Sequence, residues 1–133
     1  MCIRDSFKTL QTLRLAGNPL TAAGVKLLPV LPRLTQLDLS ECHLKNDACQ
    51  HLLRFKNLQV LHLSKTRIKR AGFLQLARLP LTEIFVKRVG LSYEDGLEFL
   101  RRCPTCQYVY YAHSDVERIE RAELTKKHRE HDP

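Results

Sequence analysis

Three polar residues in the middle of the chain have the side-chain types of a hydrolytic triad. Asp38 and His62 lie 24 positions apart, and Ser64 follows His62 by two. A serine nucleophile needs a base within hydrogen-bonding reach, but residues two apart on a strand stand about 6.5 Å apart. No nucleophile elbow is visible either. We therefore expect no catalytic residues, and we predict an exposed contact between Asp38 and His62 instead.

Cys103 and Cys106 form a C-x-x-C motif, which is typical of half a zinc site or of a redox pair. No second pair and no spaced histidines complete such a site. Both cysteines stand where other segments of the chain carry leucine or phenylalanine, and free cysteine packs well as a small hydrophobe. We therefore predict reduced cysteines with no bound metal and no cofactor. Scattered free thiols favour a reducing, intracellular and cytoplasmic location.

The elements that position these residues follow from a sequence repeat, whose copies start at Leu10, Leu34, Leu58, Leu81 and Cys106. The shared pattern is L-x-x-L-x-L-x-x-(N/C/T/V/S)-x-L, which the copy at Cys106 follows more weakly, and its L-x-L predicts a strand with the leucines on one face. A second apolar set, spaced by three, predicts a short helix or 3₁₀ segment, with Thr21 and Ser92 as N-caps.

This pattern resembles that of the leucine-rich-repeat family over residues 7–116. The resemblance implies an α/β fold, a curved leucine-rich-repeat solenoid with a parallel sheet on the concave side and short helices or 3₁₀ segments on the convex side. The physical reason is that one repeat cannot bury its own apolar side, whereas stacked repeats share a continuous core. Five copies exceed the usual minimum of about three.

The N-terminal end departs from the repeat. Residues 7–10 match residues 55–58, so Phe7 is the end of an earlier repeat and the pattern is interrupted there. Residues 1–6, MCIRDS, resemble a translated sequencing adapter. We therefore expect an artefactual prefix attached to the C-terminal fragment of a longer protein.

Residues 117–133 form a charged C-terminal segment after the last repeat. Ser114-x-x-Glu117 has the pattern of a capping box, and Val116 and Ile119 begin an apolar stripe. We predict a helix over about residues 115–127 that covers the end of the last repeat. A protein-binding tail is the alternative.

The residues between the leucines of each predicted strand project to the concave face. Toward the C-terminus they include three aromatic side chains close to basic ones, a combination typical of interface hot spots. The alternative is that the C-terminal segment covers the tyrosines. The predicted partner-binding residues are His62, Lys65, Glu83, Phe85, Lys87, Arg88, Tyr108 and Tyr110.

The charge distribution bears on the partner. Residues 1–6 and 117–133 each hold equal numbers of basic and acidic side chains, so the net charge of +8 falls on the repeats. Much of this positive charge falls on six residues that we predict to lie along one edge of the stacked repeats. Such a basic edge favours an acidic protein partner. The alternative is that it is only a solvated edge. No motif supports nucleic acid, no apolar run could span a bilayer, and we expect a monomer. The edge consists of Lys65, Arg67, Lys69, Arg70, Lys87 and Arg88.

The resemblance implies a non-catalytic scaffold for protein–protein interaction. Two alternatives keep the fold. One is the substrate-recognition arm of a ubiquitin ligase, in which an F-box would precede the repeats. The other is a regulator of a small GTPase, although such regulators have longer repeats and a catalytic arginine in a loop, for which this sequence offers no candidate.

Overall fold

The chain alternates short strands with short helices, in the order that the repeat predicts. The computed structural model describes residues 8–111 and 118–124 of the 133 residues. The elements are β1 (Thr12–Arg14), α2 (Ala22–Leu27), β2 (Gln36–Asp38), α3 (Asn46–Leu52), β3 (Val60–His62), α4 (Arg70–Gln75), η1 (Leu76–Arg78, a 3₁₀ helix), β4 (Glu83–Phe85), α5 (Tyr93–Arg102), β5 (Tyr108–Tyr110) and β6 (Arg118–Glu120).

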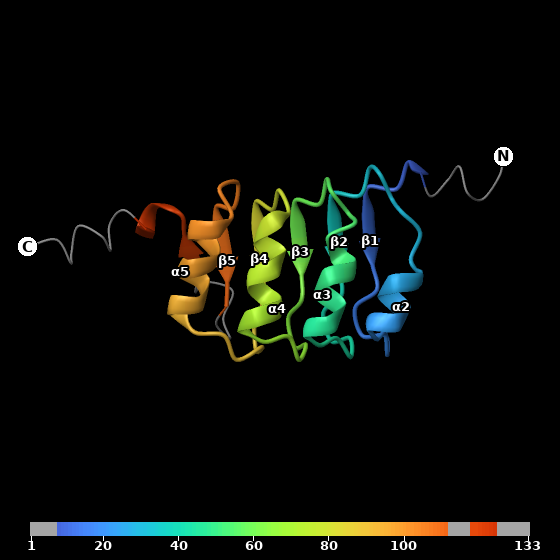
Figure 1. Cartoon of the computed structure of the whole chain (residues 1–133), viewed down its shortest axis with the longest axis horizontal. Helices are drawn as coiled ribbons and strands as arrows, with labels where there is room; N and C mark the ends of the chain where they lie inside the picture. Colours follow the sequence, from blue (N-terminus) through green and yellow to red (C-terminus); the bar gives the residue numbers. More distant parts are fainter. Residues whose placement is uncertain (1–7, 112–117, 125–133) are drawn as a thin grey trace, which may run out of the picture.

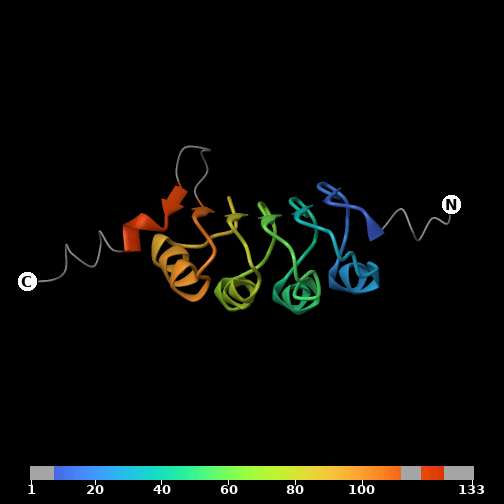
Figure 2. The same ribbon diagram turned by 90° about the horizontal axis from the view of Figure 1, so that it is seen from above.

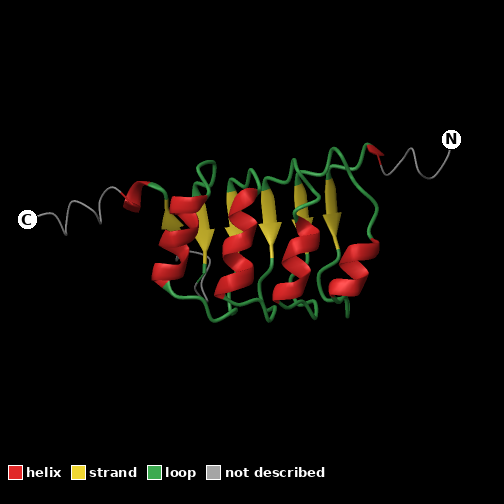
Figure 3. Cartoon of the chain, in the orientation of Figure 1, coloured by secondary structure: helices red, strands yellow, loops and turns green. Residues whose placement is uncertain are grey.

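The strands form one six-stranded sheet whose order follows the sequence. Strands β1 to β5 run parallel, and β6 pairs antiparallel with β5 (Figure 1). The helices lie side by side along the sheet (Figure 3), and from above they form a second layer on one of its faces (Figure 2). The α/β prediction is confirmed. Within the described residues, no helix is both long and apolar enough to cross a bilayer.

Equivalent residues of successive repeats pair directly across the sheet. The central residue of each strand points toward the helices, and Leu37, Leu61, Ile84 and Val109 are fully buried there. The residues on either side of this central position must point the other way, because side chains alternate along a strand. Each strand thus gives one side chain to the core and two to the open face, which is the face without helices.

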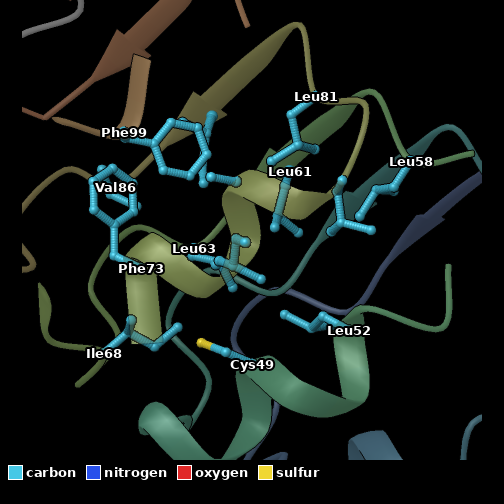
Figure 4. Packing of buried hydrophobic residues seen from close by; sticks show 14 of the residues in the cluster. Cys49, Leu52, Leu58, Leu61, Leu63, Ile68, Phe73, Leu81, Val86 and Phe99 are labelled. Atoms are coloured by element: carbon cyan, nitrogen blue, oxygen red, sulfur yellow. The ribbon is translucent and has the colours of Figure 1, made fainter. Parts of the chain in front are cut away.

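The core between the layers is a single cluster of aliphatic and aromatic side chains (Figure 4). Phe73 of α4 and Phe99 of α5 stack at 4.5 Å between ring centroids, which ties neighbouring helices together. The apolar column predicted from the second part of each repeat is fully buried. It consists of Val25, Cys49, Phe73 and Leu97.

The turn after each strand explains the (N/C/T) position of the repeat. Asn18 Nδ2 donates to Leu15 O at 2.9 Å, and Thr66 Oγ1 donates to Leu63 O at 2.7 Å. A small polar side chain at this position therefore adds a hydrogen bond to a backbone carbonyl of the turn. Cys42 Sγ makes the same kind of bond, to Leu15 O of the preceding repeat.

Left-handed backbone conformation recurs one position before that polar residue. Gly17 has φ 79°, and Glu41 and Lys65 have φ 60° and 58°. Arg88, at φ 57°, occupies the same place in the next repeat. Non-glycine residues seldom adopt this region, so the turn geometry is imposed by the sheet and the helix on either side of it.

The two predicted helix caps differ. Ser92 Oγ accepts a hydrogen bond from Asp95 N, and the Asp95 carboxylate accepts one from Ser92 N, so α5 begins with a full capping box. Thr21 does occupy the N-cap position of α2, but its side chain makes no capping hydrogen bond.

The prediction of a helix over about residues 115–127 is wrong at its centre, because strand β6 occupies 118–120. Ile119 is fully buried between exposed Arg118 and half-buried Glu120, an alternation of period two that suits a strand better than a helix. A single helical turn at 122–124 follows. Ser114, Val116 and Glu117, on which the capping prediction rested, lie outside the described residues.

Arg121 fastens this C-terminal segment to the last helix. Its guanidinium donates to Leu100 O at 2.6 Å, to Cys106 O at 2.7 Å and also to Cys103 O. Two of these carbonyls lie at the C-terminal end of α5, where a helix has no backbone donors of its own. The side chain therefore satisfies acceptors that would otherwise lack partners.

We expect Arg121→Gln to lower the free energy of unfolding by about 2 kcal/mol, because bonds from a charged donor to buried carbonyls are lost. Arg118→Gln is the control, since Arg118 is exposed and its ion pair with Glu120 is also exposed. Denaturant unfolding measures both. Equal losses for the two variants would contradict the anchoring role of Arg121.

A column of small residues lies where each helix approaches its neighbour. Gly24, Ala48, Gly72 and Gly96 are equivalent positions of successive repeats. A Cβ at Gly72 would lie 2.5 Å from Asn46 Oδ1 and 3.0 Å from Asn46 Cα. Asn46 cannot easily retreat, because its Oδ1 accepts a hydrogen bond from Lys69 N at 2.7 Å.

We expect Gly72→Ala to destabilise the fold by about 1–2 kcal/mol through overpacking, although alanine is the better helix former. The matched control is Gly24→Ala, whose new Cβ would meet only the Leu20 side chain, mainly the Cδ1 at its tip. That tip can move, so this variant should be neutral or gain up to about 1 kcal/mol. Thermal unfolding of both variants tests the difference in sign.

Candidate functional site

The open face of the sheet carries two columns of side chains, one from each residue that flanks the buried centre of a strand. Their character changes from polar at β1 and β2 to mostly aromatic at β4 and β5. The strand register places the members of each column side by side. One column is Thr12, Gln36, Val60, Glu83 and Tyr108, and the other is Arg14, Asp38, His62, Phe85 and Tyr110.

Three rings of the second column stack on one another. The His62 and Phe85 centroids lie 4.2 Å apart with 7° between the planes, and those of Phe85 and Tyr110 lie 4.2 Å apart with 2°. Equivalent positions on adjacent parallel strands are separated by about 4.8 Å, so rings standing upright on them meet face to face. We call these three residues the ring ladder.

Two cations lie close to aromatic rings at the C-terminal end of the open face. Lys87 Nζ lies 5.8 Å from the Phe85 centroid and 5.9 Å from that of Tyr110. The Arg118 guanidinium covers the Tyr108 ring at 4.8 Å. These distances are within the range of cation–π attraction. The Arg118 guanidinium thus lies over a ring face, whereas Lys87, nearly equidistant from two rings stacked 4.2 Å apart, lies beside the ladder.

The described part of the C-terminal segment, residues 118–124, leaves the tyrosines half-buried, although it touches one of them. Strand β6 extends the sheet beside β5, and only Arg118 reaches over Tyr108. Tyr108 and Tyr110 are both half-buried. The rings therefore remain accessible in part, and β6 forms one border of the aromatic surface.

The contribution of Arg118 is not predicted from the sequence, because the pattern there predicts a helix where β6 forms. The signal that could have revealed it is the short alternation Arg118-Ile119-Glu120 with one apolar residue at its centre. Three residues of alternation are weak evidence by themselves. Only the pairing of Ile119 with Val109 on β5 makes the strand evident.

The Asp38, His62 and Ser64 side chains are near one another but have separate partners. Asp38 Oδ1 accepts from Ser40 N at 3.0 Å, and Ser64 Oγ accepts from Lys87 N at 3.1 Å. Asp38 and His62 are register neighbours, yet the imidazole stacks on Phe85. Ser64 thus belongs to the backbone turns, and no hydrogen bond joins it to His62 within the described residues.

His62 is the titratable member of the ring ladder. Burial lowers its pKa below the usual value, and Arg14 and Lys87 act in the same direction. The carboxylates of Asp38 and Glu83 oppose this, but burial is the largest contribution. The imidazole is therefore neutral near pH 7 and stacks as an uncharged ring.

The predicted basic edge is not a single cluster in the structure. Lys65 Nζ forms an ion pair with Glu41 at 3.0 Å in the turn region, where Arg88 is exposed. Arg70 instead begins α4 on the helix layer and pairs with Asp95. Lys87 alone of this group contacts the ring ladder. The predicted edge does not form one surface, because the strand and the helix of a repeat lie in different layers of the structure.

The cysteines are part of the core. Cys103 Sγ donates to Leu79 O at 3.4 Å, and Cys106 Sγ donates to Tyr108 O at 3.4 Å. Hydrogen bonding with Cys103, together with burial, raises the pKa of the Cys106 thiol, and burial raises the pKa of Cys49 to about 12. Among the described residues, no three side chains of the metal-ligating types come together.

The first strand–helix unit of the chain is similar to a known protein family. A family model described as "Leucine Rich repeat" matches residues 8–28, the segment that contains β1 and α2. The match supports a leucine-rich-repeat family. Leucine-rich repeats are generally modules for protein–protein interaction. No curated protein matches the chain.

The environment of His62 leads to a pH-dependent prediction. Because its folded-state pKa lies below the unfolded value, the unfolded chain binds the proton first as pH falls through about 6.5. Stability is then lost until the folded-state pKa is reached, and it is retained above the unfolded pKa. His62→Gln should remove this loss from denaturant unfolding measured between pH 7.5 and pH 5.

The direct measurement is NMR titration of the His62 imidazole signals, with a short unfolded histidine peptide as the reference. His62 should titrate at lower pH than the peptide, because its pKa is lowered by burial. An equal or higher midpoint for His62 would show that Asp38 and Glu83 outweigh the burial of the ring.

Proposed function

We propose that this chain is a non-catalytic protein-interaction module. In this proposal, residues 7–116 form a leucine-rich-repeat solenoid, and its open, concave face binds another protein. The supporting observation is the ring ladder of His62, Phe85 and Tyr110, which stands outward on the sheet. The leucine-rich-repeat match at the first strand–helix unit agrees with such a role.

The ring ladder has the properties of a binding anchor. Its rings are only half-buried, and outward aromatic side chains with restricted rotamers offer large contact area at low entropic cost. Stacking occupies the faces of the rings. The ladder therefore presents ring edges and the Tyr110 hydroxyl to a partner, and aromatic edges carry partial positive charge. Oxygen atoms of a partner are favoured at such a surface.

Charged residues around the ladder would form the rim of the interface. Lys87 is adjacent to the Phe85 and Tyr110 rings, and Glu83 pairs in register with Tyr108. Lys65 and Arg88 lie farther out, in the turns after β3 and β4. With more basic than acidic groups in this set, we propose an acidic partner surface. Rim charges of this kind act mainly on the association rate.

The experiment uses photo-crosslinking, because the partner is unidentified. A benzophenone amino acid placed at Gln36 reports the open face, and one placed at exposed Gln50 of α3 reports the helix layer. We expect proteins to be captured from Gln36. Capture only from Gln50 would contradict the use of the open face.

We expect Phe85→Ala or Tyr110→Ala to weaken binding to the captured protein by about 2 kcal/mol, as for an aromatic hot spot. The control is Thr12→Ala, an exposed position at the polar end of the same face. Calorimetry measures affinity, and melting temperature checks that folding is retained. Unchanged affinity of folded Phe85→Ala and Tyr110→Ala proteins would refute the anchor.

A further inference from the structure

A hollow on the helix layer, on the opposite side from the ring ladder, is lined by three arginines. It has a volume of about 440 Å³ and lies along α4 and η1, with the end of α5 at one side. Arg70, Arg78 and Arg102 line it, and no acidic side chain is among the described residues that do so. We propose that this hollow binds an acidic peptide segment of a partner protein. This site is additional to the open face.

Two of the arginines are oriented by carboxylates of α5. Arg70 Nε contacts Asp95 Oδ1 at 3.0 Å, and Arg102 Nε contacts Glu98 Oε1 at 2.9 Å. Each contact uses only the Nε position of the guanidinium. The terminal nitrogens, which suit a bidentate carboxylate contact, have no hydrogen bond to any described residue. The arginine side chains are thus fixed in direction and still have donors to offer.

Arg78 has no acidic partner in the described part of the chain. It is exposed at the end of η1, and it occupies the position in its repeat that Arg102 occupies in the next one. The counterpart one repeat earlier, Arg54, instead donates to Val25 O and Leu28 O at 2.9 and 3.1 Å. Of these three equivalent arginines, Arg78 is therefore the one most available to an external anion.

The surface between the arginines is aliphatic apart from Gln75, which is exposed. Ala71 is exposed, and Leu74 and Ala77 are buried except for 8% and 7% of their surface, which is accessible to solvent. A ligand that fills this hollow meets arginines at its ends and aliphatic groups between them. An acidic peptide with an apolar side chain fits that order. The phosphate backbone of a nucleic acid offers negative charge to the arginines but no apolar side chain for the surface between them.

The spacing of the arginines restricts the peptide. Arg70 and Arg78 are eight residues apart, which corresponds to about 12 Å along a helix. Two residues separated by four positions in an extended peptide are about 13 Å apart. We infer a segment of the form acidic-x-apolar-x-acidic, whose two carboxylates reach the two ends of the hollow.

The test uses the full chain and a nine-residue probe, Gly-Gly-Glu-Ala-Leu-Ala-Glu-Gly-Gly, in an NMR titration at two salt concentrations. We expect shifts confined to α4, η1 and the end of α5. The same peptide with glutamine for glutamate should bind at least about tenfold more weakly, because both carboxylate contacts are lost. A probe with serine for leucine should lose about threefold or more.

Arg78→Gln and Arg102→Gln should each raise the Kd of the acidic probe about threefold or more. Arg33→Gln is the matched control, since Arg33 is exposed in the loop before β2 and carries the same charge. It should change the Kd less than twofold. Phe85→Ala should have no effect, because Phe85 lies on the opposite face of the sheet.

Three results would overturn the proposal. The first is equal affinity for the glutamate and glutamine probes. The second is an equal effect of Arg33→Gln and Arg78→Gln, which would indicate unspecific attraction to a basic protein. The third is tighter binding, through the same arginines, of a single-stranded oligonucleotide or of phosphatidylserine vesicles than of the acidic probe.

Discussion

Every feature of this molecule depends on the pairing of equivalent residues on adjacent strands. A strand of three residues buries only one side chain, and a helix of six or seven residues is too short to be stable alone in water. Neither element could persist without its neighbours. Because the repeats pair in phase, Leu37, Leu61 and Ile84 lie beside one another and close a continuous apolar layer. Stability is thus a property of the interfaces between repeats rather than of any one of them.

The same in-phase pairing also produces order on the surface. The central residue of each strand lies in the core, whereas the residues on either side of it lie on the open face. Three of these open-face positions carry His62, Phe85 and Tyr110, and the strand spacing places their rings within stacking distance of one another. On the other layer, equivalent helix positions of successive repeats bring arginines to neighbouring places in the same way. Side chains at equivalent positions of successive repeats are therefore neighbours in space, both on the open face of the sheet and on the helix layer.

The sequence predicts the repeated part of this fold well, because its apolar spacing reports burial directly. The L-x-L triplets locate β1 to β3, the equivalent Ile84-Phe85-Val86 locates β4, and the cap of α5 follows from Ser92. The aromatic residues of the open face were also identified, since alternation along a strand fixes their side. Which rings stack, and which cations cover them, depends on side-chain rotamers that no spacing encodes.

The failures of prediction occur where the repeat ends or where its two layers separate. Strand β6 has no leucine pattern, and its formation depends on the contact of Ile119 with α5 and β5. The basic residues from Lys65 to Arg88 are close in sequence but are divided between the turns, the open face and the helix layer. Proximity in sequence does not imply proximity in space when a strand and the following helix lie on opposite sides of a core.

The uniform register of the parallel strands has a consequence for engineering. Each interior unit, such as β3 with α4 and η1, contacts only the units on its two sides, and those contacts have the same form throughout. A duplicate of such a unit could therefore be inserted beside the original, and it would widen the sheet by about 4.8 Å. The antiparallel β6 and the Arg121 anchor would still close the final repeat. The breadth of the face becomes an adjustable dimension, set by how many copies of one unit the gene encodes.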